Sequence, residues 1–337
     1  MQIGPYSLRN RVFVAPMAGV TDRPFRQLCK RLGAGYAVSE MAASNPALWA
    51  SVKTSRRIDH AGETEPRAVQ IAGADPSMMA QAARFNVDRG AQIIDINMGC
   101  PAKKVCNVQA GSALMANESL ALSIIDAVAR AVDVPVTVKM RTGPTRSDRN
   151  APRLARAAEQ AGAAMITVHG RSRACAFLGE AEYDTIAEVK AVVSVPVVAN
   201  GDITGPDDAL KVLRLTGADA VMIGRAAQGR PWIFREIAAA LAGETLPPEP
   251  DANELKELLL AHLLDHHAFH GALTGVRTAR KHVGWYLSHL PDGKRFLRDE
   301  FFPIESPEAQ ITALERWFDR APRALAAASL QEERLAA

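Results

Sequence analysis

Cysteine is scarce in this 337-residue chain, which contains only Cys29, Cys100, Cys106 and Cys175. No two of them are spaced as CxxC, so the sequence does not show the pattern of a disulfide framework. Reduced thiols are typical of the cytoplasm. We therefore expect a cytoplasmic protein, and no residue pattern leads us to expect a bound metal.

Long apolar runs and a large charge excess are also missing. No stretch of about 18 apolar residues occurs, so we expect no transmembrane helix and no membrane partner. Residues 1–10 lack the charged-then-apolar pattern of a signal peptide. The net charge of +3 is too small to indicate a nucleic-acid partner, which only local charge could reveal.

A repeating pattern of helices and strands runs through most of the chain. Gly-Ala recurs at 33–34, 90–91, 162–163 and 217–218, each time after a helical pattern. Glycine there supplies the left-handed residue that ends a helix. The apolar runs that follow read as strands buried on both faces: "YAVSEM", "IIDINMG", "AMITVHG" and "AVMIG".

Four further runs complete a set of eight strands: "RVFVAPMAG", "RAVQIAG", "VPVTVKMR" and "VPVVANGD". Asp75-Pro76 and Gly205-Pro206 mark helix starts between them. Eight β-α units match the size of a (β/α)8 TIM barrel, which we predict for residues 1–242. A doubly wound open sheet is the alternative, but no GxGxxG follows the first strand.

The composition changes after the predicted barrel. Residues 243–251 contain three prolines and read as a linker, and residues 252–337 read as helices ending in an alanine-rich tail. We therefore predict a small C-terminal helical domain.

Polar residues follow nearly every predicted strand. In a TIM barrel the C-terminal strand ends form the active site, so together these residues predict a polar pocket. Singly, Lys139 could be a solvated charge, His169 a core histidine and Glu40 purely structural. The strand-end set is Pro16, Met17, Ala18, Gly19, Glu40, Gln70, Asn97, Cys100, Lys139, Arg141, His169, Arg171, Asn200, Gly201, Asp202, Gly224 and Arg225.

The pocket suits a phosphorylated flavin. Gly201 and Gly224 end strands seven and eight, whose loops often bind phosphate in barrels, although a tight turn closing the barrel is the alternative. Amides such as Gln70 and Asn97 can match the pyrimidine edge of a flavin, and Lys139 could stabilise its reduced ring.

Six motifs in order carry a family resemblance: "APMAGVTDRPFR", "DINMGCPAKKV", "VKMRTG", "VHGRSRA", "ANGDI" and "GRAAQGRPW". Together they resemble the tRNA-dihydrouridine synthase family, most closely its bacterial B type, from Ile3 to about Phe318. The resemblance implies a TIM barrel with FMN and a helical domain that binds tRNA. It also implies reduction of the C5–C6 double bond of a D-loop uridine, with NADPH or NADH as reductant.

The same resemblance implies roles for individual residues. Cys100 would be the catalytic acid, giving a proton to C5. The residues that would hold FMN are Pro16, Met17, Ala18, Gln70, Lys139, His169, Asn200, Gly201, Asp202, Gly224 and Arg225.

The setting of Cys100 fits that role. A thiol with an ordinary pKa of about 8.5 is mostly protonated at neutral pH and can donate. Gly99 lets the chain turn sharply and Pro101 stiffens the loop. The alternative is that Cys100 is a small apolar filler.

Local positive charge indicates where RNA would bind. Six cations against one acid occur between residues 277 and 298, with Trp285 and Tyr286 interleaved, although these two aromatics could instead be helical core. The candidate substrate-binding residues are Asn97, Lys103, Lys104, Arg141, Arg171, Arg277, Arg280 and Lys281.

Three rival functions remain open. A dihydroorotate-dehydrogenase-like flavoprotein would share the barrel and FMN but act on a small pyrimidine. A Schiff-base aldolase would use Lys139. The third rival is an RNA-binding or chaperone protein whose barrel has lost catalysis. We expect a monomer. The segment "CNVQAG" after "CPAKKV" is less basic than we expect for close relatives, and Leu178 stands where we expect a polar residue.

Overall fold

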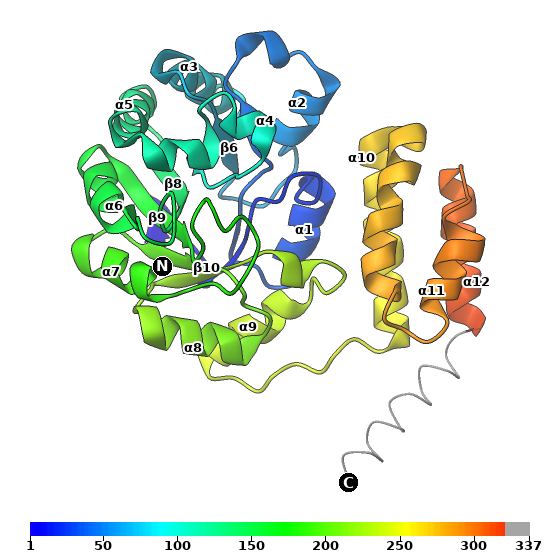
Figure 1. Cartoon of the computed structure of the whole chain (residues 1–337). Coiled ribbons are helices and arrows are strands. Elements are labelled where there is room, and N and C mark those ends of the chain that lie inside the picture. The colour runs from blue at the N-terminus through cyan, green and yellow to red at the C-terminus, as the bar shows by residue number, and fades with distance from the viewer. Residues whose placement is uncertain (321–337) are drawn as a thin grey trace. The chain divides into compact units, whose positions relative to one another are not determined.

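In the computed structural model, residues 1–320 are described, and they form two compact units. The first comprises residues 1–226 and 234–246, and the second comprises residues 227–233 together with the chain from residue 247 onward. The last part of the predicted helical domain, residues 321–337, lies outside the described residues. Figure 1 shows the order of the elements along the chain.

A parallel sheet of nine strands forms the core of the first unit, in the order β4-β3-β11-β10-β9-β8-β7-β6-β5. The strands are β3 (Val12–Val14), β4 (Tyr36–Ala37), β5 (Ala42–Ala43), β6 (Ala68–Ala72), β7 (Ile93–Met98), β8 (Val136–Arg141), β9 (Ala163–His169), β10 (Val197–Asn200) and β11 (Ala220–Ile223).

The two ends of this sheet meet at a single chain segment. β4 and β5 are consecutive in sequence, and between them Val38 forms a parallel bridge with Ala68 of β6. The Ser39 N–H donates to the Ala68 carbonyl at 3.0 Å. Counted as one position, β4 and β5 reduce the nine strands to eight, as in a (β/α)8 barrel. The predicted TIM barrel is confirmed.

Helices follow the strands and surround them, as Figure 1 shows for α3, α5, α6, α7 and α8. The regular helices of this unit are α1 (Arg23–Arg31), α2 (Val52–Ile58), α3 (Pro76–Val87), α4 (Lys103–Cys106), α5 (Glu118–Ala129), α6 (Ala151–Gln160), α7 (Asp184–Val192), α8 (Pro206–Thr216) and α9 (Ile233–Ala242). Short 3-10 turns lie at η1 (Pro46–Leu48), η2 (Gly111–Ala116) and η3 (Arg225–Ala227).

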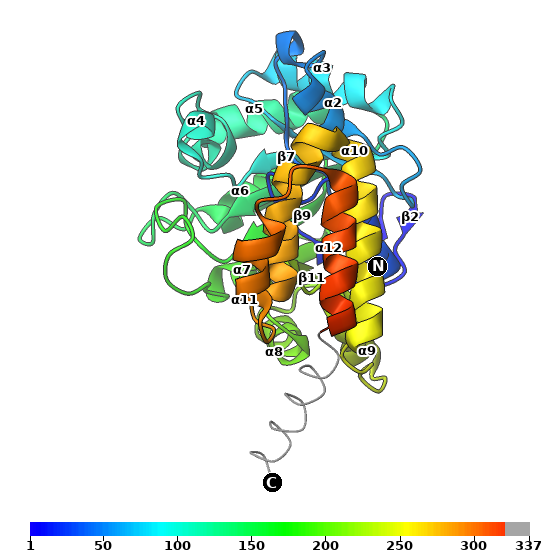
Figure 2. The same ribbon diagram turned by 90° about the vertical axis from the view of Figure 1, so that its right-hand side faces the viewer.

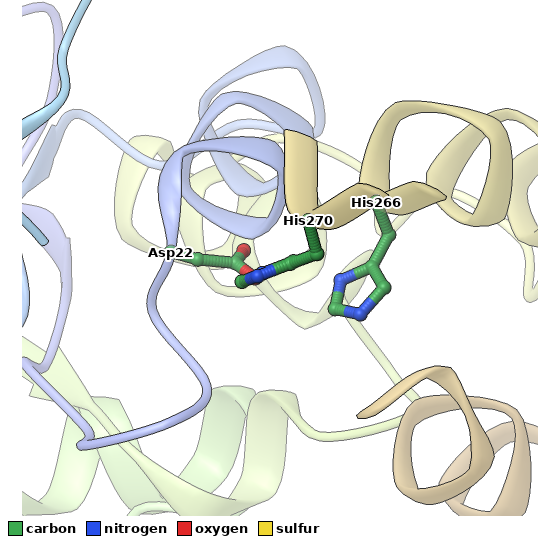
Figure 3. A group of neighbouring side chains, drawn as sticks. All are labelled: Asp22, His266 and His270. Carbon is green, nitrogen blue, oxygen red and sulfur yellow. The ribbon is translucent and has the colours of Figure 1, made fainter. Parts of the chain in front are cut away.

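Local signals in the sequence set many helix ends. Asp75 accepts the Met78 N–H at 2.7 Å and Pro76 opens α3, as predicted. The carboxylate of Asp22, drawn in Figure 3, caps α1 in the same way by accepting the Phe25 N–H at 3.0 Å. All four glycines of the Gly-Ala pairs have positive φ, so they end their helices as expected.

An N-terminal hairpin of β1 (Gln2–Ile3) and β2 (Tyr6–Ser7), which the sequence did not predict, supplies apolar residues to the barrel interior. Ile3 and Leu8 belong to the same buried cluster as Phe13, Tyr36 and Met222. This apolar core is built from strand interiors, which leaves the C-terminal strand ends for polar side chains.

The second unit is helical, as predicted. It contains α10 (Ala252–Leu287), α11 (Gly293–Phe296), the π-helical turn η4 (Leu297–Phe301) and α12 (Pro307–Arg320). Figure 2 shows α10 as two segments with α12 beside it, and the break falls at Gly271, whose φ is 74°. Its core includes Trp232, Tyr286 and Trp317, so the interpretation of Tyr286 as core is confirmed.

Several histidines lie close together within this helical unit. His266 and His270 stand one turn apart on α10, with ring centroids 4.4 Å apart (Figure 3). His266 also contacts the Thr278 hydroxyl at 2.8 Å. No helix among residues 1–320 is both long and apolar enough to cross a membrane.

Candidate active site

Parallel pairing aligns the candidate residues at the C-terminal ends of neighbouring strands. In the sheet register Asn97 of β7 pairs with Lys139 of β8, and His169 of β9 pairs with Asn200 of β10. Gln70 was expected at a strand end but lies in the middle of β6, where it pairs with Asp95 of β7. Gln70 is hydrogen-bonded to Asn97, Asn97 pairs with Lys139 in the register, and Lys139 is hydrogen-bonded to Asn200, so this series links residues that are up to 130 positions apart in sequence.

Lys139 is a buried cation in this group. It is 9% exposed, and its Nζ donates to Oδ1 of Asn200 at 3.0 Å. Burial, together with the nearby Arg141, lowers the pKa of Lys139 to about 8. The Asn200 amide donates onward to the Met222 carbonyl of β11 at 2.8 Å. Lys139 is thus held in place inside the barrel and is not a solvated strand-end charge.

His169 is neutral at physiological pH. Burial, and then the positive charges of Lys139, Arg141 and other cations, lower the pKa of His169 to about 2. Its Nε2 lies 3.4 Å from a guanidinium nitrogen of Arg171. The ring can therefore accept or donate hydrogen bonds and offer an apolar face, but it does not add a positive charge.

A line of side-chain amides leads to Cys100. The Gln70 carbonyl oxygen Oε1 accepts from the Asn97 amide at 2.7 Å. Oδ1 of Asn97 accepts the Cys100 backbone N–H at 3.0 Å and the Gly99 N–H at 3.3 Å. Asn97 therefore fixes the turn that presents the thiol at the end of β7.

The Cys100 loop is also tied on its other side. The Cys100 carbonyl accepts from the Ser112 N–H at 3.0 Å and from the Ser112 hydroxyl at 2.9 Å. The Cys106 thiol lies 3.5 Å from the same carbonyl. Cys100 is half-buried, so the loop is held while its side chain keeps some access to solvent.

The loops after β10 and β11 lie close to the other candidate residues. Gly201 has a φ of 126°, and a Cβ there would lie 2.8 Å from the Ala181 side chain. Asp202 accepts from Arg171 at 2.7 Å and from Arg225 at 3.3 Å. Position 201 therefore favours glycine, because its φ is positive and a Cβ would press against the Ala181 side chain.

The loop after β3 carries Pro16, Met17 and Ala18, and it is fastened at two points. The Met17 N–H donates to the Thr21 hydroxyl at 2.8 Å, and the Gly19 N–H donates to the Glu40 carboxylate at 2.6 Å. Glu40 therefore holds this loop, which favours the structural role that the sequence suggested. Gly224 lies nearby, and a Cβ there would be 3.8 Å from the Met17 sulfur.

Two of the candidate RNA-binding cations are buried. Arg141 is 1% exposed and donates to the Gly99, Ser172 and Ala176 carbonyls at 2.6, 3.0 and 2.6 Å. Arg171 is 4% exposed and donates to the Gly179 carbonyl at 2.6 Å as well as to Asp202. These contacts favour a role in holding the loops over direct contact with a phosphate.

The other candidate cations are more accessible. Lys103 and Lys104 lie exposed on α4, directly after the Cys100 loop. In the helical unit Arg277 is exposed, while Arg280 is partly buried and donates to the Ile304 carbonyl at 3.1 Å. Lys281 is also partly buried.

Two features of the site could not be recognised in the sequence. Asp95 lies in the middle of β7 and is 2% exposed. In the sequence it is surrounded by apolar residues, so its position did not indicate a role in the site. Phe177 is 55% exposed, with the guanidinium carbons of Arg141 and Arg225 at 5.4 and 6.0 Å from its ring centroid. An exposed aromatic ring beside cations can stack on a base. Phe177 lies in an irregular loop, where the sequence pattern does not indicate such a role.

The residues present fit a phosphorylated flavin. The donor set combines a buried cation at Lys139 and side-chain amides with a tightly packed glycine at position 201. The charged residue Arg225, with its side chain 59% exposed, stands at the phosphate-binding end expected in such barrels.

The fold and the site together define the class of this protein, which is a (β/α)8-barrel enzyme with its polar centre at the C-terminal strand ends. The family model for dihydrouridine synthase matches residues 13–322, and the chain belongs to the dihydrouridine synthase family.

Relatives named tRNA-dihydrouridine synthase B match nearly the whole chain. The Pseudomonas aeruginosa protein is 59% identical over 94% of this chain and 96% of its own. The Salmonella typhimurium protein is 57% identical over 95% and 99%, respectively.

Solved structures support the fold. A morphinone reductase variant aligns with a TM-score of 0.52 and 17% identity over 76% of this chain and 92% of its own. A histamine dehydrogenase from Rhizobium aligns with a TM-score of 0.54 and 13% identity, over 78% of this chain and 50% of that one.

Proposed function

We propose that this chain is a flavin-dependent reductase that converts uridine to dihydrouridine in tRNA, with FMN bound in the barrel and NADPH as the reductant. Family membership supports the reaction. The observation that carries the assignment is the pairing of Asn97, which holds the Cys100 backbone, with Lys139 in the sheet register. A proton donor and a buried cation are thereby fixed at adjacent strand ends.

The flavin would supply the hydride for C6 of the uracil ring when it is bound. Lys139 and Gln70 would contact its ring system, with Pro16, Met17, Ala18 and His169 along it. The residues that would hold the ribityl chain and phosphate are Asn200, Gly201, Asp202, Gly224 and Arg225. NADH is the alternative reductant.

Cys100 would deliver the proton to C5. A thiol that is half-buried and held through its own backbone at both the N–H and the carbonyl can be aimed at a substrate atom. An ordinary thiol is mostly protonated near neutral pH and so begins the reaction in the donating form.

Binding of tRNA would use exposed cations and an extruded base. A base inside a helix must leave its stack to reach a barrel pocket. Lys103 and Lys104 follow the Cys100 loop directly and would contact phosphates near the target. Arg277, Arg280 and Lys281 of the helical unit, which we assign as the tRNA-binding domain, would contact the backbone elsewhere. Arg141 and Arg171 would hold the loops, and Asn97 would position both Cys100 and the base.

A single chain contains every residue that this proposal uses, so we propose that the monomer is active. The step needs no metal ion, and a tRNA-modifying enzyme of this kind would work in the cytoplasm, where its substrate is.

The direct test is product formation. Purified protein with FMN and NADPH is incubated with tRNA from cells that lack dihydrouridine, and the nucleosides are analysed by mass spectrometry. Dihydrouridine at a D-loop position supports the proposal. Reduction of a free pyrimidine such as orotate, with tRNA left unchanged, would favour the small-molecule reductase instead.

A further inference from the structure

The carboxylate of Asp95 is buried inside the barrel, away from solvent. It is 2% exposed and lies in the middle of β7, two residues before Asn97. Its Oδ1 accepts from the Thr137 hydroxyl at 2.6 Å, and its Oδ2 accepts from the Gln70 side-chain amide at 2.7 Å. The function proposed above gives this group no task.

Asp95 determines the orientation of the two amides that follow. An ionised carboxylate can only accept hydrogen bonds, so Gln70 must turn its NH2 group toward it. The Gln70 oxygen then faces Asn97, which must present its own NH2 group at 2.7 Å. As a result, the Asn97 oxygen faces the Cys100 N–H at 3.0 Å.

We propose that Asp95 is a positioning residue for Cys100, acting through the fixed amide orientations of Gln70 and Asn97. The proposal rests on the proposed function, because it takes Cys100 as the proton donor. A donor in place of the Asp95 carboxylate would reverse both amides. The NH2 group of Asn97 would then face the Cys100 N–H, two donors would oppose each other, and the loop would lose a hydrogen bond.

Neighbouring groups act on the charge of Asp95 in opposite directions. Burial raises the pKa of Asp95 to about 6, while the hydrogen bonds from Thr137 and Gln70 and the charge of Lys139 favour the carboxylate. Tyr36 of β4 is a further titratable neighbour, and burial followed by the charge of Asp95 raises the pKa of its hydroxyl. Asp95 is therefore mainly ionised at pH 7 and gains a proton below about pH 6.

The test compares four variants with the wild type: Asp95→Leu, Asn97→Ala, the double variant, and Thr137→Val as the control. Leucine has a similar shape without acceptors. Valine at 137 removes a hydroxyl from the other oxygen of Asp95 and leaves the Gln70–Asn97–Cys100 line intact. Two quantities are measured: the rate of iodoacetamide alkylation of the Cys100 peptide by mass spectrometry, and kcat and KM for dihydrouridine formation.

We expect Asp95→Leu to lower kcat by about tenfold with little change in KM, because a misplaced donor slows the chemical step. The released loop should alkylate about threefold faster, since local opening exposes the thiol. Thr137→Val should change neither quantity by more than about twofold. In the Asn97→Ala background Asp95→Leu should add almost nothing, because both changes break the same line.

Three results would overturn the proposal: unchanged Cys100 alkylation in Asp95→Leu, an effect of Thr137→Val as large as that of Asp95→Leu, or additive effects in the double variant. If the wild type forms no dihydrouridine, the proposed function fails, whereas the alkylation comparison still tests the positioning of Cys100.

If Asp95→Leu does not fold, the variant Asp95→Asn provides the test of the proposal. The alkylation rate of Cys100 against pH should show a break near pH 6 in the wild type, where Asp95 gains its proton, and no break in Asp95→Asn. Identical profiles for the two proteins would rule out Asp95 as the positioning group.

Discussion

The ammonium group of Lys139 on β8 lies 3.0 Å from the carboxamide oxygen of Asn200 on β10, skipping the strand between them. This contact spans one intervening strand and holds a positive charge in a place that water barely reaches, since Lys139 is only 9% exposed. A buried cation of this kind reduces stability, which suggests that it is kept for a ligand.

Replacing Lys139 by methionine should therefore stabilise the flavin-free protein. Burial lowers the pKa of Lys139 from 10.5 to about 8, so the folded state disfavours the charged form. Between those pH values the unfolded chain binds more protons, and wild-type stability rises with pH. We expect Lys139→Met to raise the free energy of unfolding at pH 7 by about 1 to 2 kcal/mol, measured by urea unfolding.

The same comparison at about pH 9.5 provides the control, because much of the penalty on Lys139 has gone there. The advantage of the methionine variant should shrink, and its affinity for FMN should be weaker than that of the wild type. A variant less stable than the wild type at pH 7, or an advantage that grows with pH, would contradict this account of Lys139.

A side chain at Gly201 should disturb the loop after β10, which we propose holds the flavin phosphate. The φ of 126° is unfavourable for any other residue, and the new Cβ would meet the Ala181 side chain at 2.8 Å. We expect Gly201→Ala to lower the free energy of unfolding by about 1 to 3 kcal/mol and to weaken FMN binding about tenfold, measured by fluorescence titration.

Gly205 is the matched control for this substitution. Its φ is −173°, and a Cβ at this position would have no neighbouring atom within 4 Å, so Gly205→Ala should cost less than about 1 kcal/mol and leave FMN binding unchanged. Equal losses of FMN affinity in the two variants would show that the effect at Gly201 is not specific to the proposed phosphate site.

Removing Arg277 should weaken tRNA binding in a salt-dependent way. Its side chain is exposed on α10, so it can reach a phosphate without losing a structural contact. We expect Arg277→Ala to reduce the slope of log K against log salt concentration by about 1. Lys256 on the same helix pairs with Asp319 at 2.7 Å, and Lys256→Ala should leave the slope unchanged. An unchanged slope for Arg277→Ala would remove this residue from the interface.

Much of the barrel could be predicted because each repeat carries its own local signals. Glycine at positions such as Gly33 and Gly162 ends a helix through its positive φ, and a two-faced apolar strand follows at once. Some strand ends are equally readable, since a polar residue such as His169 or Asn200 closes an apolar run. Parallel pairing then brings the C-terminal ends of the strands to the same end of the barrel, so their proximity can be predicted from the sequence.

The remaining features depend on tertiary contacts. The second strand position is split into β4 and β5, and only the Val38–Ala68 bridge shows that the two are one position of the barrel. Arg141 follows an apolar strand just as a rim cation would, and its burial against three carbonyls comes from loops distant in sequence. Asp95 was missed because a charge inside an apolar run has no visible partner until Gln70 and Thr137 are placed beside it.

Loss of the Cys100 thiol should stop dihydrouridine formation without weakening FMN binding. Cys100→Ala removes the proposed proton donor but leaves the backbone contacts to Asn97 and Ser112 available. We expect dihydrouridine formation to fall by about 10² to 10⁴-fold, with FMN binding unchanged. Cys106→Ala, on the neighbouring helix α4, removes only a 3.5 Å sulfur contact to the Cys100 carbonyl, which keeps its Ser112 hydrogen bonds, so this matched control should retain activity. Undiminished product from Cys100→Ala would remove Cys100 as the acid.

The central claim is that a flavin in this barrel reduces tRNA, and anaerobic absorbance of the purified protein tests it most directly. The flavin band is bleached with NADPH, and tRNA from cells that lack dihydrouridine is then added, with fully modified tRNA as the control. We predict that the band returns with the unmodified tRNA and stays bleached with the control. A flavin band that stays bleached with both tRNAs, or a protein that binds no flavin when FMN is added, would contradict the account.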